Sequence, residues 1–343
     1  MSTNFVDSYR TPKRSFPWKK VLIAFFIFLA LIGLYVAYSV FATADNLMRR
    51  ESGERNPFAT NMMPTHDELN FYSLDEATQL NGWFFRGNKY PALGNILIVH
   101  NNGDSKAQFG LKTGDLYRNL QEEGYNVFAF DLQHSGNSGG ELSGFGYFEY
   151  EDVIAAMQTI KKLTGSTDFV LFGIGTGCNA SLFAYDQLPS KDTPREKLTE
   201  QQKKINVSRE DIKAFIFDTP VAKASDYIKA EIPQDNFYQK YVLRKLVPQA
   251  VKMSSGSSET DNLLPFYSSI TIPMLLMANS DDQFLEQDDI TAVFNERIRL
   301  LPSQTATKVF QQTGHLNAYR HQAEEYIDQL NAFLDRWLGE TEQ

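Results

Sequence analysis

The feature of this 343-residue sequence that most restricts its folding is an uncharged apolar segment near the amino terminus. Residues 21–43 read VLIAFFIFLALIGLYVAYSVFAT and contain no Asp, Glu, Lys or Arg. As a helix this segment would be about 34 Å long, which is enough to cross a hydrocarbon core of roughly 30 Å. In water the same helix would expose apolar side chains on every side. The segment therefore predicts a helix that crosses a membrane.

The charges around this segment predict its orientation. Residues 1–20 carry five Lys or Arg and one Asp, although the whole chain is acidic, with 33 Lys plus Arg against 42 Asp plus Glu. Three arginines follow the segment within residues 44–65. Basic residues favour the cytoplasmic side of a membrane. We therefore expect residues 1–20 to form a basic cytoplasmic tail, residues 21–43 a signal anchor, and the carboxyl-terminal body to lie outside the cytoplasm.

Two other interpretations of the apolar segment remain open. The A-T-A sequence at residues 42–44 has the form of a signal-peptidase site, although the apolar stretch exceeds the usual 7–15 residues of a signal core. The segment could also be a buried helix of the globular body, which its position behind a basic run disfavours. The polar residues 44–65 are predicted to form a juxtamembrane linker, and residues 66–340 the globular domain.

The composition is that of an ordinary globular protein and excludes several classes of function. Apolar residues make up 42% and charged residues 22%, which argues against a largely disordered chain. The net charge of −9 makes nucleic-acid binding unexpected. The single cysteine, Cys178, excludes an intramolecular disulfide and a Cys-rich zinc site. The sequence has no HExxH, EF-hand or phosphate-loop pattern, so we expect no metal and no cofactor.

Short apolar runs alternate with amphipathic stretches of helical length along the body. The sequence predicts strands at residues 80–85, 95–100, 126–130, 168–172, 212–217, 273–278 and 307–311, and helices at about 106–123, 148–163, 177–188, 285–299 and 319–338. Several of the strands are nearly continuous apolar runs, as expected where both faces of a sheet are covered. The alternation predicts an α/β fold with a mostly parallel central sheet and helices on both of its faces.

Residues 221–270 interrupt this alternation. They contain helical apolar patches followed by the loop SSGSS at residues 254–258. An insertion between two strands with apolar residues of its own is typical of a cap. We expect a small helical lid over the carboxyl edge of the sheet.

Polar loops follow five of the predicted strands. Ligands of open α/β sheets bind beyond the carboxyl ends of the strands, so these loops are where a site is expected. The loops read HNNGD at 100–104, DLQHSGNSGG at 131–140, GIGTGC at 173–178, NSDD at 279–282 and GH at 314–315.

This ordered set of loops resembles the α/β-hydrolase fold, specifically the small-lid, serine aminopeptidase-like branch, which often carries an amino-terminal anchor. The resemblance covers roughly residues 68–340. It implies a G-x-S-x-G nucleophile elbow between a strand and a helix, an acid after a later strand and a histidine after the last strand. His315 matches the histidine of the family and Asp282 the acid, with Asp281 as a weaker alternative.

The nucleophile position departs from the family pattern. In GIGTG at residues 173–177, Gly175 stands where the family has serine. Glycine adopts the strained conformation of an elbow without a Cβ clash, but it has no side chain that could attack a carbonyl. Thr176, Cys178, Ser105 and Ser138 are the other hydroxyls and thiol nearby, and each is a disfavoured substitute. Thr176 is expected to present its backbone N–H to an oxyanion instead.

Two neighbouring loops depart from the family pattern as well. The family usually has His-Gly after its oxyanion strand, whereas this chain has His100-Asn101. The family pattern D-x-R-G-x-G-x-S becomes DLQHSGNS at residues 131–138, without the Arg-Gly pair. Asn101, Asn102 and Thr176 are the predicted oxyanion or binding residues.

The sequence therefore predicts a membrane-anchored α/β-hydrolase-like protein that has lost serine acyl-transfer chemistry. It would bind a lipid-like or ester ligand or act as a regulatory module. An active hydrolase of an ester, thioester or amide remains an alternative, using water activated by His315 and Asp282 or a non-serine nucleophile. A further alternative is a structural membrane partner that makes protein contacts through residues 221–270. The sequence identifies no particular protein partner.

Overall fold

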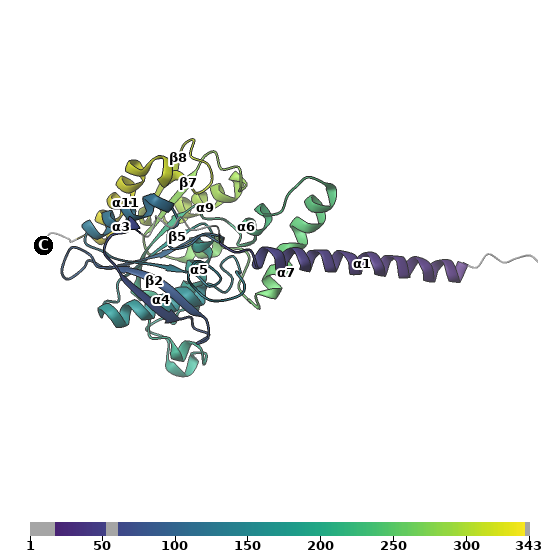
Figure 1. The fold of residues 1–343 in the computed structure, drawn as a ribbon, viewed down its shortest axis with the longest axis horizontal. Coiled ribbons are helices and arrows are strands. Elements are labelled where there is room, and N and C mark those ends of the chain that lie inside the picture. Colours follow the sequence, from purple (N-terminus) through teal and green to yellow (C-terminus); the bar gives the residue numbers. More distant parts are fainter. Residues whose placement is uncertain (1–17, 53–60, 340–343) are drawn as a thin grey trace, which may run out of the picture.

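The computed structural model describes residues 18–52 and 61–339 and is built on one eight-stranded sheet (Figure 1). The strands are β1 (Asp67–Tyr72), β2 (Gln79–Phe85), β3 (Asn95–Val99), β4 (Asn126–Asp131), β5 (Phe169–Ile174), β6 (Ile212–Asp218), β7 (Met274–Asn279) and β8 (Thr305–Phe310). Their order is β1-β2-β4-β3-β5-β6-β7-β8. From β4 to β8 all neighbours are parallel, while β1 and β2 pair antiparallel. The predicted mostly parallel sheet is confirmed.

Helices cover both faces of the sheet because alternate strand residues point to opposite sides. In β3, Ile96 and Ile98 face one apolar layer and Leu97 and Val99 face the other. The first layer is completed by α3 (Thr113–Glu122), α10 (Ala318–His321) and α11 (Ala323–Leu338). The second is completed by α4 (Tyr150–Thr164), α5 (Thr176–Gln187) and α9 (Gln287–Leu300). This is the predicted arrangement of helices on both faces.

The predicted lid is present between β6 and β7. It consists of α6 (Ser225–Ala230), a π-helical turn η5 (Gln239–Leu243), α7 (Arg244–Ser254) and α8 (Leu264–Ser269). Its buried side chains, including Tyr227 and Val247, belong to the same apolar layer as α4 and α5. The lid is therefore packed onto the domain as part of its core.

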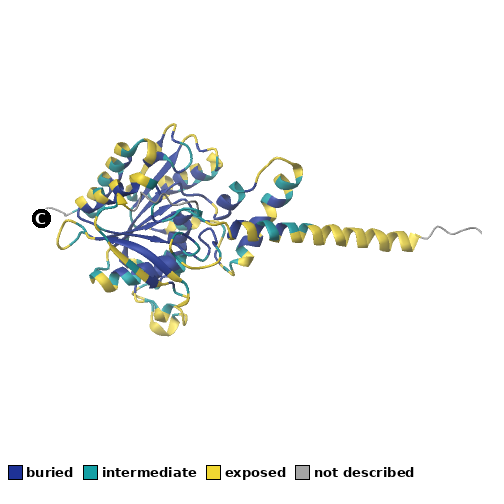
Figure 2. Ribbon diagram, viewed as in Figure 1, coloured by how far each residue is buried: buried dark blue, intermediate teal, exposed yellow. Residues whose placement is uncertain are grey.

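The helix α1 (Trp18–Met48) leaves the domain as one long extension (Figure 1). It is the one helix among the described residues that is long and apolar enough to cross a membrane. Its amino-terminal part is exposed, whereas Val40, Ala44, Leu47 and Met48 are buried against the domain (Figure 2). These last turns pack on α7 of the lid. The helix is thus continuous from its exposed part into the core.

Several boundaries differ from the sequence prediction. The helix α1 ends at Met48, so the first residues of the predicted linker 44–65 are helical and packed. Most of the predicted basic tail, and residues 53–60 of the linker, lie outside the described residues. The edge strand β1 was missed because only Leu69 and Phe71 of its six residues face the core, which is too short an apolar pattern to predict a strand.

Two predicted helices are shorter than expected. The helix predicted at 106–123 begins at Thr113, because Lys106 is buried in a loop and points its ammonium group at a carboxylate. The helix predicted at 319–338 is divided at Gln322, which adopts φ −130° and ψ 53° and so separates α10 from α11.

Candidate active site

Gly175 forms the sharp turn between β5 and α5. Its backbone has φ 58° and ψ −122°, a conformation that side chains adopt only with strain. Its N–H donates to the carbonyl oxygen of Asp218 at the end of β6, at 2.9 Å. The turn is therefore fixed to the neighbouring strand at the carboxyl edge of the sheet.

The glycines on either side of this turn are required by close backbone approach. A Cβ on Gly177 would overlap the carbonyl oxygen of Val99 in β3 and lie 2.7 Å from its carbonyl carbon. A Cβ on Gly173 would lie 2.7 Å from the backbone nitrogen of Cys178. Both distances are too short for real Cβ atoms, so strand β3, the turn and α5 can approach this closely only with glycine at these positions.

The side chain of Asn101 occupies the space beside Gly175. A Cβ built on Gly175 would lie 2.7 Å from Asn101 Cγ and would overlap its Oδ1. Asn101 Oδ1 accepts a hydrogen bond from the backbone N–H of Thr176 at 3.0 Å. Because this N–H belongs to the first turn of α5, it has no partner within the helix and favours an oxygen with partial negative charge. The amide oxygen of Asn101 supplies that partner.

The hydroxyl of Thr176 is held by the same loop. Thr176 Oγ1 accepts from the N–H of Asn102 at 2.7 Å and donates to Asn101 Oδ1 at 3.3 Å. Asn102 Oδ1 in turn accepts from Ser143 Oγ at 2.5 Å, and the N–H of Ser143 donates to the carbonyl of Met48 at 2.7 Å. These bonds bring together the three predicted residues Asn101, Asn102 and Thr176, and they connect them to the end of α1.

The histidine and the acid lie beyond β8 and β7. His315 Nδ1 is 2.6 Å from Asp282 Oδ2. Since a carboxylate accepts, Nδ1 carries the proton of this bond, and in the neutral ring Nε2 is the acceptor nitrogen. Asp282 Oδ1 accepts from the N–H groups of Phe284 and Leu285, at 2.9 and 3.0 Å. Asp281 instead accepts from the backbone of the loop before His315. The structure thus pairs His315 with Asp282.

Aromatic side chains set the environment of the His315 ring. Its centroid lies 4.6 Å from the ring of Phe284 and 5.9 Å from that of Tyr227 in the lid. The side chain of His315 is 21% exposed.

The alternative acid, Asp281, accepts from the N–H groups of Thr313 and Gly314 at 3.1 Å each. Asp281 therefore shapes the loop that carries the histidine.

A buried chain of hydrogen bonds that sequence analysis missed joins the ends of β6 and β7 to the loop before His315. Asp218 ends β6, accepts from Tyr326 Oη at 2.8 Å and from Thr219 Oγ1 at 2.9 Å, and is buried. Burial raises the pKa of Asp218 to about 6, and the two hydroxyl donors oppose that shift. Thr219 Oγ1 accepts from Asn279 Nδ2, whose Oδ1 accepts from Thr313 Oγ1. The sequence feature that could have identified Asp218 is an acidic residue at the end of an apolar strand.

The other candidate nucleophiles are engaged in local structure. Cys178 is fully buried, its Sγ donates to the carbonyl of Gly173 at 3.3 Å, and burial raises the pKa of its thiol. Ser138 Oγ donates to the carbonyl of Asp131 at 2.6 Å. Ser105 Oγ accepts from the N–H of Ala107 at 3.3 Å. A protonated, buried thiol is a poor nucleophile, and the two serines stabilise their own loops.

A buried ion pair holds the loop after β3 against the loop after β4. Lys106 Nζ contacts the carboxylate of Asp131 and donates to Asn81 Oδ1 at 2.7 Å. It also lies 4.8 Å from the centre of the Trp83 ring. Asp131 accepts from the N–H groups of Lys106 and Asn137 at 2.7 Å each. This pair is the second feature that sequence analysis missed.

His100 is a structural histidine in the same loop. The N–H of Leu132 donates to His100 Nε2 at 2.9 Å, so Nε2 is unprotonated and Nδ1 carries the proton toward the carbonyl of Asn101, at 2.8 Å. Burial lowers the pKa of His100, which is consistent with the neutral ring. His100 therefore positions the backbone of Asn101.

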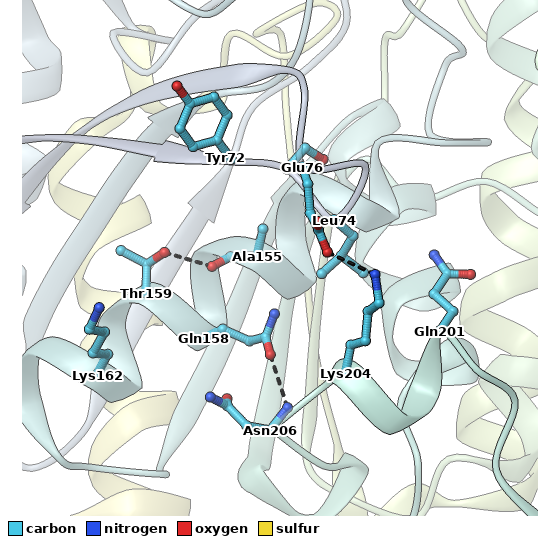
Figure 3. A pocket seen from close by; sticks show the side chains of 11 residues that line it. Tyr72, Leu74, Glu76, Ala155, Gln158, Thr159, Lys162, Gln201, Lys204 and Asn206 are labelled. Atoms are coloured by element: carbon cyan, nitrogen blue, oxygen red, sulfur yellow. Dashed lines mark hydrogen bonds and ion pairs between the residues drawn. The ribbon is translucent and has the colours of Figure 1, made fainter.

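A separate hollow of about 360 Å³ lies on the side of the domain formed by α4 (Figure 3). Its walls come from the β1–β2 turn, α4 and residues 201–206, and ion pairing of Glu76 with Lys204 at 2.9 Å crosses it. It is distinct from the loops at the carboxyl edge.

Within residues 18–52 and 61–339, no three His, Cys, Asp or Glu side chains are grouped so that they could hold a metal ion.

Comparison with known proteins identifies the fold. No family model and no curated protein matches the sequence. The esterase Pf2001 of Pyrococcus furiosus superposes with a TM-score of 0.61 at 18% identity, covering 84% of this chain and 98% of the esterase. The α/β hydrolase GrgF from a Penicillium species gives 0.56 at 16% identity, with 81% and 100% covered. An esterase domain from Rhodothermus marinus gives 0.52 at 15%, with 80% and 100% covered. The chain has the α/β-hydrolase fold.

Proposed function

We propose that this protein is a membrane-anchored α/β-hydrolase-fold protein that has lost serine acyl-transfer chemistry and serves as a ligand-binding or regulatory module. One observation carries the proposal. The amide oxygen of Asn101 accepts from the N–H of Thr176 and fills the space that a side chain at position 175 would need. The position that resembles the nucleophile of the family thus has no side chain, and the space beside it is occupied.

The hydrogen bond between Asn101 and Thr176 has a chemical meaning in a hydrolase fold. The N–H that follows the nucleophile donates to the oxyanion in α/β hydrolases. Here that N–H already donates to an amide oxygen of the same chain, at 3.0 Å. A substrate carbonyl would have to displace Asn101 before it could be polarised. Acyl transfer would therefore need two changes, a nucleophile at 175 and removal of the Asn101 side chain.

The membrane anchor is proposed from α1. The uncharged part of α1 begins at Val21, and residues 21–35 are exposed along their whole length, which corresponds to about 22 Å of a hydrocarbon core of roughly 30 Å. The basic residues before this segment support a cytoplasmic amino terminus with the globular domain on the other side. Flotation of the full-length protein with vesicles, resistant to alkaline carbonate, would test the anchoring.

A lipid-like or ester ligand is the small molecule that fits this proposal. The loop that bears Asn102 is connected through Ser143 to the carbonyl of Met48, the last residue of α1. The candidate site thus lies beside the end of the proposed anchor. Structures of similar fold include esterases, which supports an ester-type ligand without establishing one.

Labelling by a fluorophosphonate probe of serine hydrolases tests the loss of acyl-transfer chemistry. We expect no labelling of the wild type and none of Gly175→Ser, because Asn101 still fills the site. The double variant Asn101→Gly with Gly175→Ser restores both the nucleophile and the space. Labelling of the double variant that disappears on adding His315→Ala would support the proposed relation to the family. Labelling of the wild type would contradict the proposal.

Residual hydrolysis by activated water is the second candidate function. The observation that favours it is the pairing of His315 with Asp282 at 2.6 Å, which orients the ring so that Nε2 of the neutral imidazole can accept a proton. Hydrolysis of a simple ester by the purified wild type, abolished by His315→Ala and unaffected by the fluorophosphonate, would establish this function. If the wild type hydrolyses the ester no faster than His315→Ala does, the binding or regulatory role remains the proposed function.

A further inference from the structure

We infer that the lid is a membrane-contacting surface, in which Phe237 and Tyr241 enter the lipid headgroup region beside α1. The inference rests on the proposed anchoring and adds that the domain is held in one orientation on the bilayer. The two side chains are 75% and 47% exposed, and their rings pack together with centroids 4.8 Å apart. An exposed aromatic pair of this kind is typical of an interaction surface.

Contacts with α1 place this aromatic pair beside the anchor. The ring of Tyr238 lies 6.3 Å from that of Tyr35, and the hydroxyl of Tyr238 contacts Ser39 Oγ. Figure 1 shows the lid (green) beside the domain-proximal part of α1 (purple). Phe237 and Tyr241 lie one and three residues from Tyr238, and their rings pack together, so we place them near its level along α1.

The length of the apolar part of α1 determines how deep Tyr238 and its neighbours lie in the bilayer. The uncharged part of α1 begins at Val21, so a bilayer core of roughly 30 Å measured from there ends close to Val40. Tyr35 and Ser39 are the residues that contact Tyr238. The level of Phe237 and Tyr241 is therefore the membrane interface. Tyrosine and other aromatic rings prefer this region, where one end is apolar and the other is hydrated.

The lid as a whole, residues 225–269, has five basic and five acidic side chains and is neutral, but the segment that carries the aromatic pair is basic. Residues 233–256 contain Lys240, Arg244, Lys245 and Lys252 against Asp235, so their net charge is 4 − 1 = +3, in a chain whose net charge is −9. Lys240 and Lys245 are exposed. Basic side chains near a membrane surface contribute about 1 kcal/mol each with anionic lipids. A basic patch on an acidic protein points to an anionic bilayer as the occupant.

The attachment of α1 to the lid is rigid. Val40, Ala44, Leu47 and Met48 are buried in the core, and α1 packs on α7. Arg50 beyond the helix pairs with Glu231 of the lid at 2.5 Å. A flexible tether would let the domain rotate freely. A packed helix instead presents the same lid surface to the bilayer continuously.

A site-specific fluorescence experiment tests the inference. The full-length protein carrying Phe237→Cys is labelled with an environment-sensitive fluorophore and placed in phosphatidylcholine vesicles containing phosphatidylserine. Cys178 is buried, so labelling is confined to the new thiol. Leu163→Cys is the matched control, since Leu163 is apolar, 41% exposed and near the end of α4, which leads to the amino edge of β5. Spin-labelled lipid should quench the probe at 237 several-fold more strongly than the probe at 163.

The outcomes separate the inference from the proposed anchoring. If the protein floats with the vesicles but spin-labelled lipid quenches the probes at 237 and 163 equally, the inference is wrong while the anchoring stands. If the protein fails to float, the anchoring itself is wrong, and the inference falls with it. Labelled copies of the protein could instead show energy transfer to each other and no quenching by lipid. That result would show that a second copy of the chain covers Phe237, and it would also overturn the inference.

Discussion

The two halves of the candidate site differ in how they relate to the chemistry of the fold. Beyond β7 and β8, Asp282 and His315 keep the acid–histidine arrangement that the family resemblance implies, with Asp282 held by two backbone N–H groups. Beyond β3 and β5, Gly175 has no side chain and Asn101 fills the adjacent space. One half holds a paired histidine and carboxylate, and in the other an amide side chain occupies the space beside the turn.

Under the proposed function, this difference means that Gly175 is one of several residues that set the candidate site apart from the family pattern. The altered half has its own support: the buried pair of Lys106 with Asp131, and neutral His100 bonded to the carbonyl of Asn101. A single substitution by serine would therefore restore a hydroxyl without restoring a site. The predictions below test whether the two halves are as different as their contacts indicate.

The largest expected effect is on the altered half. Lys106→Met would leave the carboxylate of Asp131 buried without its ammonium partner, so we expect the free energy of unfolding to fall by about 3–5 kcal/mol. Lys308→Met is the control, since Lys308 pairs with the exposed Glu325 and should cost less than about 1 kcal/mol. Urea unfolding of both variants checks the prediction, and equal losses would contradict it.

The next effect tests the packing of Asn101. Gly175→Ser should destabilise the protein by about 1–3 kcal/mol, from strain at φ 58° and from overlap with Asn101. Gly103→Ser is the control, because Gly103 also has a positive φ, 79°, but has open space around it. Adding Asn101→Gly should relieve part of the loss at Gly175 and none at Gly103. A strictly additive double-mutant cycle would show that Asn101 does not fill the site.

The sequence predicted the parts of the fold that depend on local pattern. Continuous apolar runs located β3 and β5, and their alternation with helices predicted the parallel sheet. The pattern could not locate β1, where Phe71 alone is buried. It also could not predict Lys106 as a core residue, because lysine is normally exposed unless it is paired and its partner lies 25 residues away.

The candidate site was predictable in its residues and less so in its contacts. Asp281 and Asp282 remained alternatives because adjacent side chains point in different directions, and the backbone that decides between them belongs to another loop. Asn101 was predicted as an oxyanion or binding residue. That it bonds Thr176, 75 residues away, depends on how closely β3 and β5 approach, which no local pattern records.

A third prediction concerns pH and the loop after β4. Asp152 is buried, accepts from the N–H of Gln133 at 2.8 Å, and its pKa is raised from 3.8 to about 8 by burial. Between these two pKa values the folded state holds a proton that the unfolded state has lost, so stability falls as pH rises. Asp152→Asn removes this dependence. From pH 6 to pH 7 the wild type should lose about 1.4 kcal/mol more stability than the variant, as measured by urea unfolding at each pH. Parallel curves would contradict the raised pKa.

The smallest effect separates the acid of the pair from its neighbour. In Asp282→Asn the side-chain oxygen can still accept from Phe284 and Leu285, so we expect a loss of only about 1 kcal/mol. The new NH₂ group would face Nδ1 of His315 as a donor, which should move the ring proton from Nδ1 to Nε2. Nitrogen-15 NMR of labelled histidine reports the tautomer directly. Nε2 would then no longer be a base, so any residual ester hydrolysis should disappear with the tautomer change.

Asp281→Asn is the matched control for this variant. Its carboxylate accepts from the N–H groups of Thr313 and Gly314, so the substitution changes the loop before His315 without changing the partner of the ring. We expect the ring proton to stay on Nδ1. If both variants moved the ring proton to Nε2, the tautomer of His315 would depend on the loop as a whole. Asp282 would then have no special role in orienting the ring. A shift in Asp282→Asn alone would show that Asp282 sets the tautomer of His315, so that under the proposed function this half holds an oriented base.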